Sequence, residues 1–150
     1  MADYYGKTRT NYFSVTDEEK FKQIMGSCRG ADDIEIIDNQ QQDGSLKYGF
    51  YCEGSIYGLP ERDEDAGNTD EEYDDVDYNY DAFCEALQQI LPDDDAVLIT
   101  EVGYEKMRYL IGNCVVITNK DTKYIDINRE AVKLAATMLE NPDFITQMDY

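Results

Sequence analysis

The chain has 150 residues, of which 42% are hydrophobic, and its 33 acidic residues against 13 lysines and arginines give a formal net charge of −20. This length and apolar content predict a single folded domain, residues 1–150, with its own core. The charge creates a negative field that disfavours direct contact with nucleic acid or with an anionic membrane and favours basic protein surfaces. Histidine is absent from the sequence, which excludes imidazole acid–base chemistry and the Ser-His-Asp and Cys-His nucleophiles.

The first half of the chain predicts a strand, a helix and a β-hairpin. Residues 10–15 form the strand, and Thr16 with Glu19 then matches the capping box that starts a helix. One apolar helical face follows at the expected spacing: Phe21, Ile24, Met25 and Cys28. Apolar residues alternate in 33–39 and 45–53, and an Asp-Gly turn between them completes the hairpin.

The second half predicts the same succession of a helix and a β-hairpin, without a leading strand, and then a further strand and helix. Asn79 or Asp81 can cap a helix that ends at Pro92 and has an apolar face formed by Phe83, Ala86, Leu87 and Ile90. The expected strands cover residues 96–102, 106–118 and 122–127, and the last helix covers residues 129–140, with Asn128 as its N-cap.

The two halves align without a gap at an offset of 62 residues, which pairs Phe21 with Phe83 and Cys52 with Cys114. Few residues are identical, so the shared period can also arise by chance. We favour an internal α-β-β duplication of residues 17–54 and 79–116. The fold class is therefore α+β, with an antiparallel or mixed sheet of about five to six strands and two to three helices on one face.

The four cysteines are at least 24 residues apart, which rules out a CxxC motif or zinc-ligand spacing. Because each lies on an apolar position of an expected element, we predict four reduced, poorly accessible thiols. The first residues lack the apolar core of a signal peptide, and no apolar run approaches a membrane span. We therefore expect a soluble cytoplasmic protein.

Residues 61–81 form an acidic segment with eleven carboxylates and one arginine, a net charge of −10 that is half of the total. Most such runs are solvated loops. Three tyrosines lie among the acids, however, and a run needed only for solubility would not require them. DNA presents one charge per ~1.7 Å of its axis, so an ordered row of carboxylates can occupy a basic groove built for DNA. The expected partner-binding residues are Asp63, Glu64, Asp65, Asp70, Glu71, Glu72, Tyr73, Asp74, Asp75, Asp77, Tyr78 and Tyr80.

The first functional hypothesis is thus an acidic inhibitor that mimics DNA, binding and blocking a basic, nucleic-acid-binding protein. The second is a non-enzymatic interaction module that uses a tyrosine-rich sheet face carrying Lys47, Tyr51 and Arg108, with the acidic segment only a loop. The third is a weak calcium-responsive binder. Residues 63–68 and 119–130 approach an EF-hand loop, but neither has glycine at the required place.

Enzymatic function is not expected. The sequence contains none of the motifs GxGxxG, GxxxxGK[ST], HExxH or GxSxG. Carboxylates are so abundant that a pair of them carries no information about a catalytic acid and base. We expect no catalytic residue, no cofactor and no dedicated metal site.

Three stretches resemble one family across nearly the whole chain: YYGKTRTNYFSVTDEEKF at the start, ILPDDDAVLITEVGYEKMRYL in the middle and ENPDFITQMDY at the end. The family consists of small acidic proteins, without an assigned activity, encoded in mobile elements and phages of gut Firmicutes. The resemblance implies no catalytic residues. It implies a counter-defence role, because short acidic proteins of such elements include antirestriction and anti-CRISPR DNA mimics.

Overall fold

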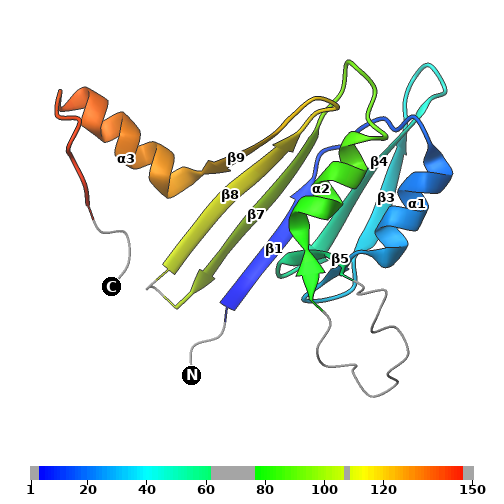
Figure 1. The fold of residues 1–150 in the computed structure, drawn as a ribbon, viewed down its shortest axis with the longest axis horizontal. Coiled ribbons are helices and arrows are strands. Elements are labelled where there is room, and N and C mark those ends of the chain that lie inside the picture. Colours follow the sequence, from blue (N-terminus) through cyan, green and yellow to red (C-terminus); the bar gives the residue numbers. More distant parts are fainter. Residues whose placement is uncertain (1–3, 62–76, 107–108, 147–150) are drawn as a thin grey trace.

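The computed structural model describes residues 4–61, 77–106 and 109–146 (Figure 1). Residues 62–76, which hold most of the acidic segment, lie outside the described residues. The elements in chain order are β1 (Tyr4–Thr10), α1 (Glu18–Ser27), β2 (Arg29–Gly30), β3 (Glu35–Gln40), β4 (Leu46–Glu53), β5 (Ile56–Pro60), β6 (Tyr78–Asn79), α2 (Tyr80–Gln88), β7 (Val97–Glu105), β8 (Tyr109–Ile117), β9 (Thr122–Asp126) and α3 (Ile127–Met138).

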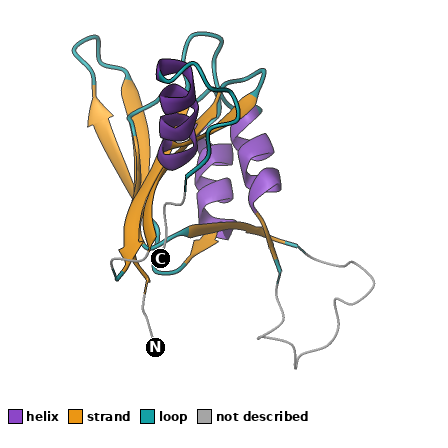
Figure 2. Ribbon diagram, turned by 90° about the vertical axis from the view of Figure 1, so that its left-hand side faces the viewer, coloured by secondary structure: helices purple, strands orange, loops and turns teal. Residues whose placement is uncertain are grey.

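The fold is α+β, as the sequence predicts. Six strands form a sheet in the order β3-β4-β1-β7-β8-β9 with every neighbouring pair antiparallel, and β2, β5 and β6 form a second, smaller sheet. Figure 2 shows α1 and α2 side by side on one side of the large sheet, with β5 and β6 on that same side. We call this side the helix face and the opposite side the open face.

The core lies between the helix face and the two helices. Four phenylalanines, Phe13, Phe21, Phe50 and Phe83, are completely buried. Phe13 contacts Phe21 and Phe50 edge to face at centroid distances of 5.7 and 6.2 Å, and Phe50 contacts Phe83 at 5.9 Å. These geometries are the favourable ones for aromatic pairs. The aromatic cluster therefore joins α1, α2 and the hairpin β3–β4 into one body.

The helix starts agree with the expected caps at one helix and differ at two. Asn79, one of the two predicted candidates, caps α2 and accepts from the backbone N–H of Ala82 at 2.9 Å. At α1 the cap is Asp17 rather than Thr16: the Asp17 carboxylate accepts from the Lys20 N–H at 3.0 Å, and the Thr16 N–H donates to the carbonyl of Ile90, just beyond α2. At α3 the cap is Asp126, which accepts from two backbone N–H groups, so this helix starts two residues earlier than expected.

The two expected α-β-β units, residues 17–54 and 79–116, place their helices on the same side of the sheet, but their connections have opposite handedness. Phe21 and Phe83 both lie in the core under the helix face. Because β4 and β7 are both antiparallel to β1, they run in the same direction on either side of it. In the sheet order, each unit's first strand (β3 or β7) comes before its second strand (β4 or β8). The first strands, β3 and β7, however, run in opposite directions, and so do the second strands, β4 and β8. With both helices on one face these arrangements are mirror-related, so the units do not superpose and the shared offset does not correspond to a structural repeat.

Helix α3 is attached differently from the other two. It follows the edge strand β9 and extends away from the sheet (Figure 1). The helix is amphipathic but buries no residue, and Leu134 and Met138 are 61% and 75% exposed. The apolar face of this helix therefore covers no part of the core. None of the described helices is long and apolar enough to cross a membrane.

All four cysteines are free, as expected. Cys28, Cys52 and Cys84 are buried. Cys114 is only half-buried, which corrects the expectation of four poorly accessible thiols. Its register partners are Thr100 and Ile125, so its side chain belongs to the open face and not to the core.

Candidate functional site

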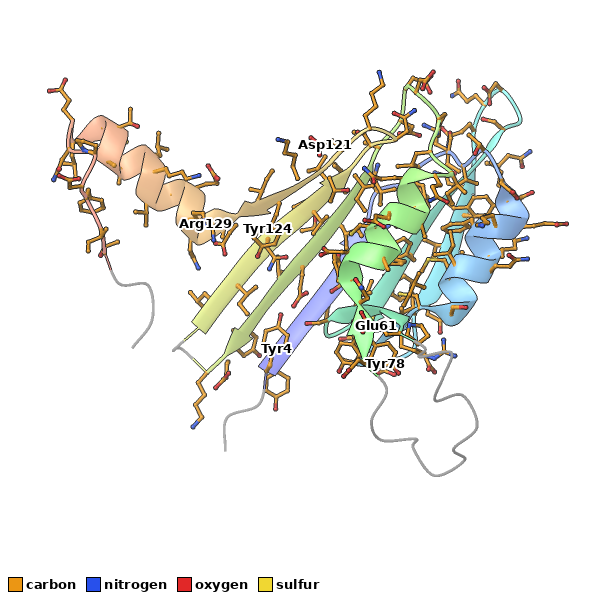
Figure 3. The ribbon with its side chains drawn as sticks, in the orientation of Figure 1. Tyr4, Glu61, Tyr78, Asp121, Tyr124 and Arg129 are labelled. Carbon is orange, nitrogen blue, oxygen red and sulfur yellow. The ribbon has the colours of Figure 1, made fainter. Side chains whose placement is uncertain are left out.

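The structure places three of the expected partner-binding residues. Asp77, Tyr78 and Tyr80 are described, and the other nine lie within residues 62–76, outside the described residues. The Glu61 N–H donates to the Asp77 carbonyl at 2.7 Å, so the two ends of the acidic segment lie side by side next to β5 and β6. Figure 3 shows Glu61 and Tyr78 together below α2.

The two described tyrosines of this segment differ in accessibility. Tyr78 is 38% exposed and its ring lies 5.8 Å from that of Tyr57. Tyr80 is half-buried and contacts Phe83 edge to face at 5.9 Å. Burial raises the pKa of the Tyr80 phenol, which stays neutral at physiological pH. Tyr78 is therefore accessible to a partner, whereas most of the Tyr80 ring supports the core.

Seven of the seventeen large apolar and aromatic residues that are exposed among the described residues lie on the open face. Strand alternation places every second residue of β4, β1, β7, β8 and β9 on it, and directly paired residues share a face. Neither α1 nor α2 covers this side (Figure 2). Its large exposed apolar and aromatic residues are Tyr5, Tyr51, Leu98, Val102, Tyr104, Leu110 and Ile125, with exposures between 39% and 57%.

An aromatic pair lies at one end of this surface, where β1 begins and β7 ends. Tyr5 on β1 and Tyr104 on β7 are register partners, and their ring centroids are 5.6 Å apart. Leu110 faces Tyr104 across the β7–β8 ladder. A hollow of about 760 Å³ opens at this end of the sheet, and these three residues, Lys7 and Val102 contribute to its lining. An aromatic or aliphatic side chain of a partner fits such a hollow.

The open face carries charged residues of both signs. Alternation and register place four cations there, Lys7, Arg9, Lys47 and Lys123, and two carboxylates, Glu35 and Glu53. Lys7 and Glu53 form an ion pair at 3.1 Å. Both side chains are exposed to solvent, so the pair contributes little to stability. Lys47 and Lys123 also form ion pairs, with Asp95 at 3.7 Å and with Asp121 at 3.6 Å. The described charges of this surface are therefore close to balanced, on a chain with a net charge of −20.

The described residues contain no cluster of three or more His, Cys, Asp or Glu side chains that could hold a metal ion. No protein-family model, curated protein or solved structure matches the chain. The resemblance to small acidic proteins of mobile elements therefore stays a hypothesis.

Sequence reasoning anticipated a polar or amphipathic sheet face with Lys47 and Tyr51, but it did not single out Tyr5, Tyr104 or Leu110 as binding residues. The available signal was the alternation in residues 97–105, where both sets of alternate positions contain apolar residues. A strand with two apolar faces inside a sheet that has helices on one side leaves one apolar face uncovered.

Proposed function

We propose that this chain is a non-enzymatic protein-interaction module that binds its partner through the open face. The observation that supports this proposal best is the row of exposed residues around the Tyr5–Tyr104 pair on the side of the sheet opposite α1 and α2. Monomeric proteins rarely expose contiguous apolar patches larger than a few hundred Å², and larger patches mark interaction sites.

The physical properties of the surface suit a binding function. A hydrogen-bonded sheet holds its side chains in fixed positions, and tyrosines supply large contact areas with few rotatable bonds. Aromatic residues in a well-packed centre commonly account for most of the binding energy of an interface. Tyr5 and Tyr104 are the expected anchors, and the cations Lys7 and Arg9 follow Tyr5 along the same interior strand, β1. The partner surface is therefore expected to present an apolar group to the two tyrosines and a neutral or acidic group to Arg9.

The acidic segment supports a second proposal, in which the chain binds and blocks a basic, nucleic-acid-binding protein. Half of the net charge lies within residues 61–81. The ends of this segment are anchored at β5 and β6, on the helix side of the sheet and away from the open face (Figure 2). Charge complementarity of this kind acts strongly on the association rate and weakens as salt screens the charges. The described ends of the acidic segment and the open face involve different residues, so mutations can distinguish the two proposals.

The experiment compares four immobilised proteins as baits in a lysate of the cells that carry the gene, with and without nuclease treatment. They are the wild type, an open-face variant, a matched control and an amide variant. The open-face variant is Val102→Ser with Tyr104→Ser. The control is Tyr57→Ser, which also removes an exposed tyrosine, 46% accessible, but from β5. The amide variant replaces five acids: Asp70→Asn, Glu71→Gln, Glu72→Gln, Asp74→Asn and Asp75→Asn.

The open-face proposal predicts partners that the wild type, the control and the amide variant retain and that the open-face variant loses. Loss of the same partners by the amide variant, with retention by the open-face variant, would contradict it and favour the inhibitor of a basic protein.

A further inference from the structure

A second recess lies on the helix face, between α2 and the strands β7, β8 and β9. Its volume is about 410 Å³. Its floor includes the apolar side chains of Ile56, Ile99 and Val115, and its polar lining includes Glu101, Asn113, Tyr80, Asp81 and Tyr124. The recess therefore combines an apolar floor with a few convergent polar groups, which is the usual make-up of a ligand site.

Two hydroxyl groups hold the carboxylate of Glu101 in one orientation. Its Oε2 atom accepts from the Tyr4 hydroxyl at 2.6 Å and from the Ser55 hydroxyl at 2.7 Å. The Tyr4 ring packs directly against the backbone of Gly6 and Gly103. A side chain at either glycine would collide with the ring, because its Cβ would lie 2.6 Å from the ring carbon Cζ. Among the described residues the other oxygen, Oε1, has no hydrogen-bond partner and the carboxylate has no ion pair. One oxygen is thus anchored and the other remains available to a ligand.

Aromatic rings and a second carboxylate complete the lining. Tyr80 at the start of α2 and Tyr124 on β9 belong to opposite sides of the recess, and Asp81 adds a second negative charge. Tyr124 projects from β9 on the side where α2 lies (Figure 3). The nearby cation Arg129, at the start of α3, does not line the recess and forms no ion pair within the described residues. Tyrosine rings and carboxylates both attract cations, and rings do so most strongly when water is excluded.

We propose that this recess binds an organic cation, a guanidinium or ammonium group on an apolar stem. The charged group donates to the Glu101 carboxylate and lies against the Tyr124 ring, and the stem covers the apolar floor. Such a group is found both in free small molecules and in the arginine and lysine side chains of proteins. The site is separate from the open face and does not depend on the proposed function.

The test is an NMR titration of the ¹⁵N-labelled full chain with N-acetylarginine amide and, separately, with N-acetylcitrulline amide. Citrulline has nearly the same shape as arginine but carries a neutral urea group. The proposal predicts that the arginine compound shifts the backbone signals of residues 99–101, 113–115 and 124, and that the citrulline compound binds at least about tenfold more weakly, because it lacks a charge-assisted hydrogen bond. A capped Ala-Arg-Ala peptide that binds more tightly than the free compound would indicate a protein side chain as the natural ligand. Weaker binding of the peptide would indicate a small molecule.

Variants test the assigned residues. Glu101→Gln keeps an oxygen that can accept from Tyr4 and Ser55 but removes the charge, and it should weaken arginine binding about tenfold or more. Glu53→Gln on the open face is the matched control and should leave binding unchanged. If Glu101→Gln does not fold, Tyr124→Ala and Tyr124→Phe replace it: the first should weaken binding and the second should not, because the ring and not its hydroxyl is needed. Equal binding of both compounds, or undiminished binding by Glu101→Gln or Tyr124→Ala, would overturn the proposal.

Discussion

Removing one aromatic ring from the core and one from the open face should have very different effects on stability. Phe83 is completely buried and contacts both Phe50 and Tyr80 edge to face at 5.9 Å. Truncating a buried phenylalanine to alanine costs about 3–5 kcal/mol, because apolar contacts are lost and a cavity remains. A domain of this size has a free energy of unfolding of roughly 5–15 kcal/mol. Phe83→Ala should therefore remove a large fraction of the stability.

Tyr104→Ala removes a ring of similar size from the open face. Half of this residue is exposed, and its ring contact across the β1–β7 ladder is with Tyr5. A cross-strand aromatic pair contributes about 0.2–1 kcal/mol, so the expected loss of stability is about 1 kcal/mol. The two variants should thus differ by about 2–4 kcal/mol, which is their difference in burial expressed as free energy.

The measurement is urea unfolding of both variants and the wild type, followed by circular dichroism at one protein concentration. Equal losses for the two variants would refute the reasoning, because Tyr104 would then have to be as buried as Phe83. A loss for Tyr104→Ala that grows with protein concentration would show instead that the open face is covered by a second copy of the chain.

Three further predictions concern the thiols, the buried phenol and the third helix. Burial raises the pKa values of the Cys28 and Cys84 thiols to about 12. Alkylation of the native protein, followed by mass spectrometry, should therefore modify Cys114 first. Faster labelling of Cys84 would contradict its assignment as a buried residue. The pKa of Tyr80 is raised by burial, so above about pH 10 the unfolded chain ionises while the folded one does not, and stability falls. Tyr80→Phe should flatten this decline in unfolding free energies measured from pH 9 to 11, and an unchanged slope would count against it. Asp126→Ala should cost about 1 kcal/mol by removing the cap, seen as faster hydrogen exchange in α3 alone; a global loss would mean that α3 supports the core.

The most regular parts of the sequence predicted their elements well. The alternation of Tyr48, Phe50 and Cys52 placed β4 within one residue of its observed start, because a strand buried on one side must bury every second residue. The helical spacing around Phe21 and Phe83 located α1 and α2 for the same reason. In both cases local periodicity and tertiary burial agree.

The second sheet was not predicted, because it depends on contacts between distant residues. Strand β5 has only five residues and ends in Pro60, so it offers no clear period. Gly58 adopts a positive φ of 118°, and a side chain there would collide with the backbone of Asn79. This close approach lets β6 pair with β5, and nothing near Gly58 in the sequence indicates that Asn79 lies beside it.

The candidate surface was only partly predictable for a related reason. Alternation in β7 separates Val97 and Ile99 from Leu98 and Val102, but both sets are apolar. Which set is buried depends on the side on which α1 and α2 lie, and that choice is fixed by the whole chain. The same limit applies to Glu101, whose setting depends on residues from β1 and from the turn before β5.

The most direct test of the open face as the binding surface is tyrosine footprinting of the chain, free and bound to a captured partner. Exposed tyrosines lie on both sides of the molecule: Tyr5, Tyr51 and Tyr104 on the open face, and Tyr57 and Tyr78 beside the ends of the acidic segment. The open-face proposal predicts that the first three lose reactivity in the complex while the last two keep it. Protection of Tyr57 and Tyr78, with Tyr5, Tyr51 and Tyr104 still reactive, would contradict it.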